Sequence, residues 1–226
     1  MNEEVLSQSV AQSSTLSTNK MIKNTYMLLS MTLLWSAALA AISIAVNLPF
    51  MASMGCSLGA IGILWFIMPR VERSAKALPW VFAFTGLLGL GLGPILQHYL
   101  AVDPSIVTSA LGLTAATFLG LSGYALVSKK DFSFMGGFLA AGVMVAFAAS
   151  IIGVVASLVF NYPMPALMLA VSGAFALLSA GIILWQTSAI VNGGETNYVS
   201  ATVTLYVAIY NLFTSLLHIL GIMGDD

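Results

Sequence analysis

The feature that most constrains this chain is a series of seven long apolar segments, separated by short polar or proline-containing stretches. A transmembrane helix needs about 20 consecutive apolar residues, whereas a membrane β-strand needs about 10 residues of alternating polarity. The pattern therefore predicts an all-α membrane protein with seven transmembrane helices and excludes a β-barrel. The expected spans cover residues 23–47, 52–68, 78–99, 106–127, 134–160, 165–190 and 200–222.

The charge content supports the same class. Hydrophobic residues make up 59% of the 226 residues and charged residues only 7%. A soluble domain carries about 25% charged residues, so this chain has too few charges to cover a water-exposed surface. The composition excludes a soluble enzyme, a nucleic-acid-binding protein and a disordered scaffold. The single cysteine, Cys56, excludes a disulfide within the chain and is expected to be a small buried side chain.

The first 22 residues differ from the rest, because they are rich in Ser, Thr, Gln and Asn and poor in large apolar residues. Such a segment buries too little surface to offset its ordering entropy. We expect residues 1–22 to form a flexible cytoplasmic tail and residues 23–226 to form the seven-helix transmembrane domain. The small-x-small sequence at 38–40 is typical of a signal-peptide cleavage site, but the apolar run continues to Val46, which favours a retained first helix.

The basic residues predict the orientation. With seven spans, all of them fall on one side of the membrane: Lys20, Lys23, Arg70, Arg73, Lys76, Lys129 and Lys130. Basic residues collect in cytoplasmic loops. The distribution therefore predicts a cytoplasmic N-terminus, and an odd number of spans then places the C-terminus on the opposite side.

Glycines and amides at membrane depth are the candidate functional positions. Gly89 and Gly93 belong to a glycine-rich run that ends at Pro94. This run fits either a flexible or pore-lining helix or tight helix packing. Gln186 and Asn211 are amides in the sixth and seventh spans. They fit either a polar pathway between these helices or an interhelical hydrogen bond.

Motifs for catalysis or for phosphate binding do not occur, and neither does a Cys/His cluster. We therefore expect no catalytic residues, no metal and no cofactor, and a protein that is not an enzyme. All eight carboxylates lie at span ends or in loops, which argues against an ion-coupled transporter. His98 and His218 lie near the outer ends of their spans and are expected to act independently.

Five sequence stretches together resemble the Bax inhibitor-1 family of seven-helix membrane proteins, over essentially the whole chain. The first opens the first span and reads Lys-Asn-Thr-Tyr at 23–26. The others are Phe-Thr-Gly-Leu-Leu-Gly with Gly-Pro-Ile-Leu at 84–96, Lys-Asp-Phe-Ser-Phe-Met-Gly-Gly at 130–137, Gly-Gly-Glu-Thr-Asn-Tyr at 193–198, and Ala-Thr-Val-Thr-Leu-Tyr with Tyr-Asn-Leu-Phe at 201–213.

The resemblance implies helices packed around a central sixth span and two functional themes. One is a pH-sensitive calcium leak that depends on acids in the sixth and seventh spans; the matching positions here are Gln186 and Ala208, which carry no carboxylate. The other, in the bacterial branch, is modulation of the inner-membrane protease FtsH, with its membrane-bound regulators as further partners. We expect a multi-pass bacterial inner-membrane protein that binds FtsH as substrate and competitor through residues 1–22, with a periplasmic C-terminus. The alternative is a calcium leak channel.

Overall fold

The computed structural model describes the backbone of residues 2–74 and 76–224, and the side chains from residue 16 onward. Seven helices in this part of the chain are long and apolar enough to cross a membrane, which confirms the predicted number of spans. The helical elements are α1 (Asn2–Ala45), α2 (Phe50–Gly62), the π-helical turn η1 (Ile63–Ile67), α3 (Met68–Val71), α4 (Ala77–Val102), α5 (Pro104–Ser128), α6 (Met135–Phe160), α7 (Pro165–Val191) and α8 (Tyr198–Met223).

The second span is longer than its prolines suggested. The sequence predicted an end at Pro69, but α2, η1 and α3 form one membrane-length segment that runs to Val71. The N–H of Met68 donates to the carbonyl of Ile63, five residues back, so the chain passes through a π-turn just before the proline. Pro69 then lies in the first turn of α3, where its missing N–H is tolerated.

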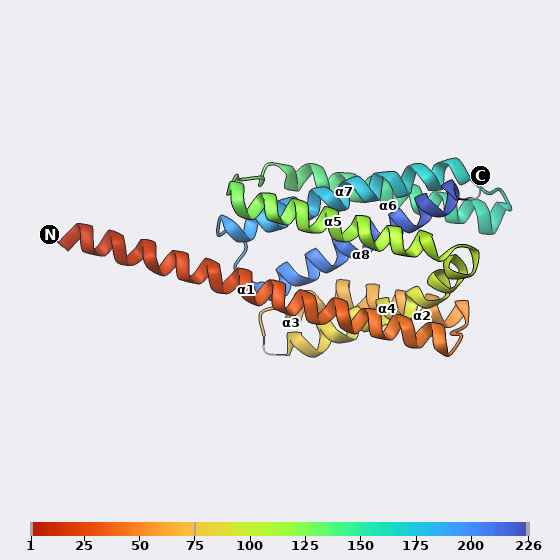
Figure 1. Ribbon diagram of the computed structural model, residues 1–226, viewed down its shortest axis with the longest axis horizontal. Coiled ribbons are helices and arrows are strands. Elements are labelled where there is room, and N and C mark those ends of the chain that lie inside the picture. Colours follow the sequence, from red (N-terminus) through yellow and green to blue (C-terminus); the bar gives the residue numbers. More distant parts are fainter. Residues whose placement is uncertain (1, 75, 225–226) are drawn as a thin grey trace.

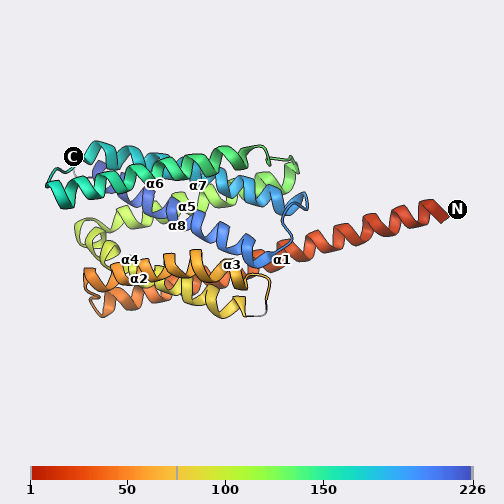
Figure 2. The same ribbon diagram turned by 180° about the vertical axis from the view of Figure 1, so that it is seen from behind.

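The helices form two layers with one helix between them (Figures 1 and 2). One layer contains α1, α2 and α4, the other contains α5, α6 and α7, and α8 crosses between the layers. It packs against α1, α4, α5 and α7. Half of its membrane window is buried, compared with 17% for α7. The seventh span is therefore the central one, and the central sixth span implied by the resemblance is wrong, because α7 sits in an outer layer beside α6.

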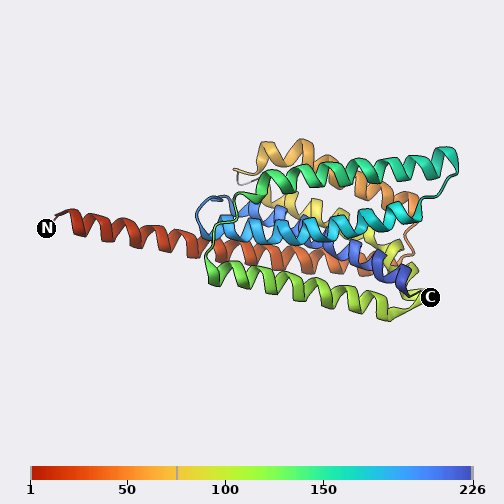
Figure 3. The same ribbon diagram turned by 90° about the horizontal axis from the view of Figure 1, so that it is seen from above.

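The connections divide cleanly between the two ends of the bundle. The end reached by the α3–α4, α5–α6 and α7–α8 connections carries the basic residues, and we call it the basic end. The opposite end, called the far end, carries the α1–α2, α4–α5 and α6–α7 connections and the end of α8 (Figures 1 and 3). The structure thus places the basic clusters together, while the side of the membrane that each end faces stays a prediction.

The N-terminal part of α1 projects from the basic end, well beyond the other helices (Figure 1). The structure describes residues 2–22 as one continuous helix with the first span, which extends to Ala45. The flexibility that the sequence predicts for residues 1–22 stays a prediction.

Candidate functional site

The glycine-rich run of α4 is a close-packing surface for α1. A Cβ added at Gly89 would overlap the carbonyl oxygen of Ser36, and one added at Gly93 would overlap the side chain of Ser43. Both serines lie on α1, and α1 packs along α4 (Figure 1). Small residues at this spacing let helix backbones approach closely in lipid. The geometry at these two candidate positions is that of tight helix packing.

Pro94 lies inside α4, where it removes one backbone hydrogen bond. A proline has no N–H, so the carbonyl of Leu90, four residues earlier, loses its partner within the helix. The hydroxyl of Ser43 on α1 donates to this carbonyl at 2.8 Å. Ser43 is 1% exposed, so water does not supply the missing bond. The interior proline is therefore tolerated because a neighbouring helix satisfies the freed carbonyl.

Tyr206 of the central helix joins α8 to the α1–α4 pair. Its hydroxyl donates to Ser36 Oγ at 2.6 Å and lies 3.2 Å from the carbonyl oxygen of Thr85. Its ring packs edge-on against Phe84, with 5.9 Å between the ring centroids. Tyr206 is 1% exposed, and a hydroxyl buried to this extent needs such partners. These bonds form a polar tie between α8 and the layer that contains α1 and α4, and the Thr202 hydroxyl adds a second one by donating to the Thr25 carbonyl at 3.2 Å.

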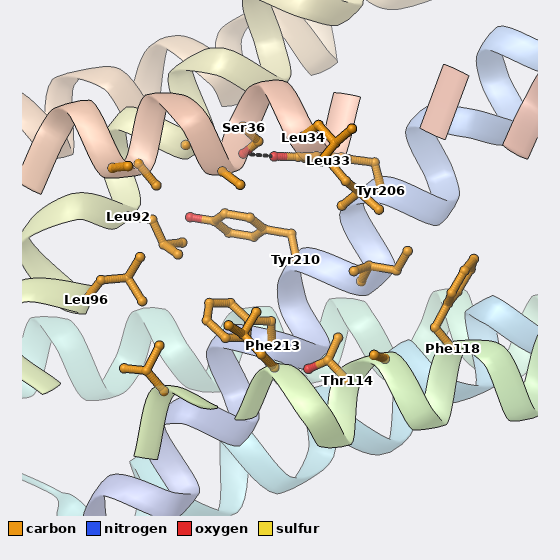
Figure 4. A pocket seen from close by; sticks show the side chains of 18 of the residues that line it. Leu33, Leu34, Ser36, Leu92, Leu96, Thr114, Phe118, Tyr206, Tyr210 and Phe213 are labelled. Carbon is orange, nitrogen blue, oxygen red and sulfur yellow. Dashed lines mark hydrogen bonds between the residues drawn. The ribbon is translucent and has the colours of Figure 1, made fainter. Parts of the chain in front are cut away.

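A groove of about 530 Å³ lies beside this tie, between α1 and α5, with α8 as its floor (Figure 4). Its lining is aliphatic and aromatic apart from a few hydroxyls. Tyr210 stacks on Tyr206 at 6.3 Å and its hydroxyl points into the groove (Figure 4). The lining residues are Leu33, Leu34, Ser36, Ala37, Ala40, Ala41, Ile44, Gly89, Leu92, Leu96, Val107, Leu111, Thr114, Ala115, Phe118, Tyr206, Ile209, Tyr210 and Phe213.

The two candidate amides lie apart from this groove. Gln186 is 2% exposed, and its Nε2 has no hydrogen-bond partner among the described residues. Ala208, the other position implied by the resemblance, is 1% exposed and shares a buried cluster with Ile183 and Ile190, one turn on either side of Gln186. Asn211 is half-buried on α8, and its carbonyl accepts a bond from the Thr214 hydroxyl.

Polar contacts near Gln186 run toward α1 and α5. The hydroxyl of Thr187 lies 3.4 Å from that of Tyr26 on α1 and 3.3 Å from that of Ser122 on α5. These contacts tie α7 to both layers of the bundle.

The loops of the basic end form a second, polar hollow of about 630 Å³ between the α3–α4 and α7–α8 connections. Glu72, Arg73, Glu195 and Asn197 contribute charged or amide groups to it. Asn197 Nδ2 donates to the carbonyl of Glu72 at 2.8 Å, and its own N–H donates to Glu195 Oε1 at 2.8 Å. The first bond joins the two connections, and the second lies within the α7–α8 connection.

The two histidines have different neighbours. His218 Nδ1 lies 2.8 Å from Ser172 Oγ, and the ring of His98 packs on its neighbour Tyr99. Among the described residues, His, Cys, Asp and Glu form no group of three that could hold a metal ion.

The sequence interpretation missed the groove and the two serines of α1 that meet the glycines of α4. Ser36 and Ser43 are seven residues apart on α1 and face glycines four apart on α4. A seven-residue repeat keeps one face of a helix toward its partner, so the serine spacing was the available signal. Of the four candidate positions, only Gly89 lines the groove.

Seven apolar helices, six of them in two layers and α8 between these layers, define a polytopic α-helical membrane protein. The chain belongs to the Bax1-I family: the model described as "Inhibitor of apoptosis-promoting Bax1" matches residues 18–225. The membership that the sequence motifs indicated is thus confirmed.

Relatives that align over most or all of their length support the assignment of the chain to the bacterial branch of the family. The chain is 47% identical to an uncharacterized membrane protein of Vibrio cholerae over 100% of both chains. It is 44% identical to the modulator of FtsH protease YccA of Escherichia coli, over 99% of this chain and 100% of that one. A Pseudomonas aeruginosa protein is 45% identical over 91% of this chain and 90% of its own length. The identity to YccA extends over all seven spans.

Proposed function

We propose that this protein binds and modulates an FtsH-type protease of the bacterial inner membrane, acting as both substrate and competitor. The observation that carries the proposal is the 44% identity to the modulator of FtsH protease YccA along the whole chain. A match of this extent covers the polar N-terminal segment as well as the membrane helices, so both parts of the proposed mechanism have a counterpart in the relative.

Residues 1–22 are the proposed point of engagement. The N-terminal part of α1 projects from the basic end, where Arg70, Arg73, Lys129 and Lys130 also lie (Figure 1). A polar helix of about 20 residues that leaves its bundle is marginally stable in water, so unwinding it costs little. Fully extended, about 22 residues reach roughly 70 Å at 3.3 Å each. That reach suits a protease that pulls on its substrates from an exposed end.

The bundle itself is the proposed source of resistance. α1 and α4 are in close contact through Gly89 and Gly93, and the carbonyl freed by Pro94 is satisfied by Ser43. In lipid, breaking a backbone hydrogen bond of a helix and leaving the group unpaired costs several kcal/mol of free energy. A substrate that is easily gripped and slowly extracted occupies the protease and competes with other substrates.

A calcium leak is the alternative function, and the buried polar groups offer it little support. In the described part of the chain, these groups are serines, threonines, Gln186 and Tyr206, without a carboxylate. A cation path at membrane depth usually includes an ionisable side chain.

Crosslinking in native membranes tests whether this protein binds FtsH. The full chain carries an affinity tag at its C-terminus, membranes are treated with a short crosslinker, and the eluate is probed for FtsH. Recovery of FtsH is the expected result. An eluate without FtsH, from membranes in which FtsH is detected, overturns the proposal and favours the calcium leak as the function.

A degradation chase tests the role of the N-terminal segment. Deletion of residues 2–12 is expected to slow degradation in cells with active FtsH and to protect a second FtsH substrate, because the shortened protein binds without being gripped. The matched control replaces residues 2–12 with an unrelated polar segment of equal length, which should be degraded at the normal rate. Equal decay of all three proteins assigns residues 1–22 to a dispensable terminus.

A further inference from the structure

The groove between α1 and α5 is open toward the bilayer and closed toward the protein. Leu34 and Leu111 form its rims and are 73% and 53% exposed. Tyr206, Ala40 and Leu92 lie at its base and are at most 6% exposed. Among the described residues, no Cα atom of α1 lies within 8 Å of one of α5, so the two layers are separated along the groove, and the rings of Tyr26 and Phe118 meet at its end. The groove is a lateral opening between the layers.

The groove covers one half of the membrane. Along α1 it runs from Leu33 to Ile44, and along α5 from Val107 to Phe118. Each stretch rises by about 16 Å at 1.5 Å per residue, roughly half of a 30 Å hydrocarbon core. α1 ends and α5 begins at the far end, so the groove belongs to the half of the membrane away from the basic end. On the side of the basic end it stops at Phe118, whose ring packs on Tyr26 at 6.0 Å.

The length of the groove separates two kinds of occupant. A partner helix that crosses the bilayer would continue through the whole hydrocarbon core, but the contact between Phe118 and Tyr26 closes the groove at about half of that depth. A single hydrocarbon chain extends through one leaflet only, which agrees with a groove about 16 Å long.

We propose that this groove is a binding site for one acyl chain of a phospholipid in the leaflet at the far end. The chain fills the lateral opening between the two layers where α1 and α5 lie apart, and covers the apolar faces of Ala37, Ala41 and Ala115. The site retains its lipid when loosely associated lipids are washed away, because its base is shaped by side chains that are already packed against one another.

The test uses the full chain, purified from membranes in a mild detergent and washed until bulk lipid is removed. Native mass spectrometry then counts phospholipids per protein. The wild-type protein is expected to retain about one. Ala115→Trp fills the groove and should lower the occupancy about tenfold, which corresponds to about 1.4 kcal/mol. Ala116→Trp is the matched control, because Ala116 is exposed on the same helix but outside the groove, and it should retain the lipid. Ala37→Trp and Ala38→Trp form a second such pair on α1.

A crosslinking arm identifies the occupant independently of these variants' stability. A photoreactive benzoylphenylalanine at Leu111 should capture a species with the mass of a phospholipid in intact membranes. Capture of a polypeptide at this position would show that a helix occupies the groove and would overturn the proposal. Equal lipid retention by Ala115→Trp and Ala116→Trp would also overturn it, by showing that the retained lipid lies elsewhere.

Discussion

The hydroxyl of Ser43 donates to the carbonyl of Leu90 at 2.8 Å, and Leu90 is the residue whose helical partner Pro94 removes. One side chain of α1 thus supplies the hydrogen bond that the backbone of α4 lacks. The contribution of this single interhelical hydrogen bond to the free energy of unfolding can be measured.

We expect Ser43→Ala to destabilise the bundle by about 1–3 kcal/mol, because it leaves a buried carbonyl unsatisfied. In a Pro94→Ala background, the restored N–H supplies that carbonyl, so the same substitution should cost about 1 kcal/mol less. Reversible unfolding in mixed micelles measures all four proteins of the cycle. Ser30→Ala is the control, because Ser30 is exposed and its hydroxyl donates to Tyr26 within α1. If Ser43→Ala lowered the unfolding free energy equally in the two backgrounds, Ser43 would not be stabilising the Leu90 carbonyl that Pro94 leaves without a helical partner.

The glycines of α4 should tolerate no side chain. Gly89→Ala and Gly93→Ala place a methyl group against Ser36 and Ser43, and each should cost about 1–3 kcal/mol of stability through overpacking. Gly112→Ala on α5 is the matched control, because a Cβ there meets nothing within 4 Å. It should leave the unfolding free energy unchanged or raise it by about 0.4–1 kcal/mol. Similar effects at all three glycines would contradict the packing role of Gly89 and Gly93.

Reporter fusions test the orientation that the basic residues predict. A reporter active only in the periplasm should be active when fused after Asp226 and inactive when inserted in the 72–76 loop. The end of α8 lies at the far end and this loop at the basic end, so the signals must differ. The reverse pattern would show that the basic end faces the periplasm.

Ion flux tests the positions that matched the family's acids. Gln186 and Ala208 cannot exchange a proton near neutral pH, so reconstituted wild-type protein should show no calcium flux that switches with mild acidification. The double variant Gln186→Asp with Ala208→Asp places one buried, ionisable carboxyl group on each of the packed helices α7 and α8. A pH-dependent flux is then expected only in the variant, measured with a calcium dye in liposomes. A clear pH-gated flux in the wild-type protein would contradict this prediction.

Asp103 gives a prediction for stability against pH. Its carboxylate accepts bonds from the Ser105 hydroxyl at 2.6 Å and the Ser105 N–H at 2.8 Å, at the start of α5. These bonds, the hydroxyl bond first, hold the pKa of Asp103 below its ordinary value of 3.8. A lowered pKa means that the stabilisation is present above the unfolded pKa and is lost as the pH falls through the folded one. The difference in melting temperature between wild type and Asp103→Ala should therefore shrink as the pH falls below about 4. A difference that is constant with pH would show that the charge of Asp103 does not contribute.

The sequence by itself determined the number of spans, their approximate bounds and the gathering of the basic residues at one end. These follow from length and polarity alone, because a chain in lipid must satisfy its backbone within each helix and must keep its charges in water. The family also followed from local stretches such as residues 193–198 and 201–213.

The tertiary structure decided which helix is central, where the layers separate and how the prolines are accommodated. The apolar spans present hydrophobic residues on nearly every side, so periodicity does not reveal which face of α7 or α8 meets another helix. Ser43 is an ordinary residue in the sequence and acquires its role only because α1 packs along α4 at Leu90. The groove is likewise invisible to composition, because it exists only where α1 and α5 lie apart over the floor formed by α8.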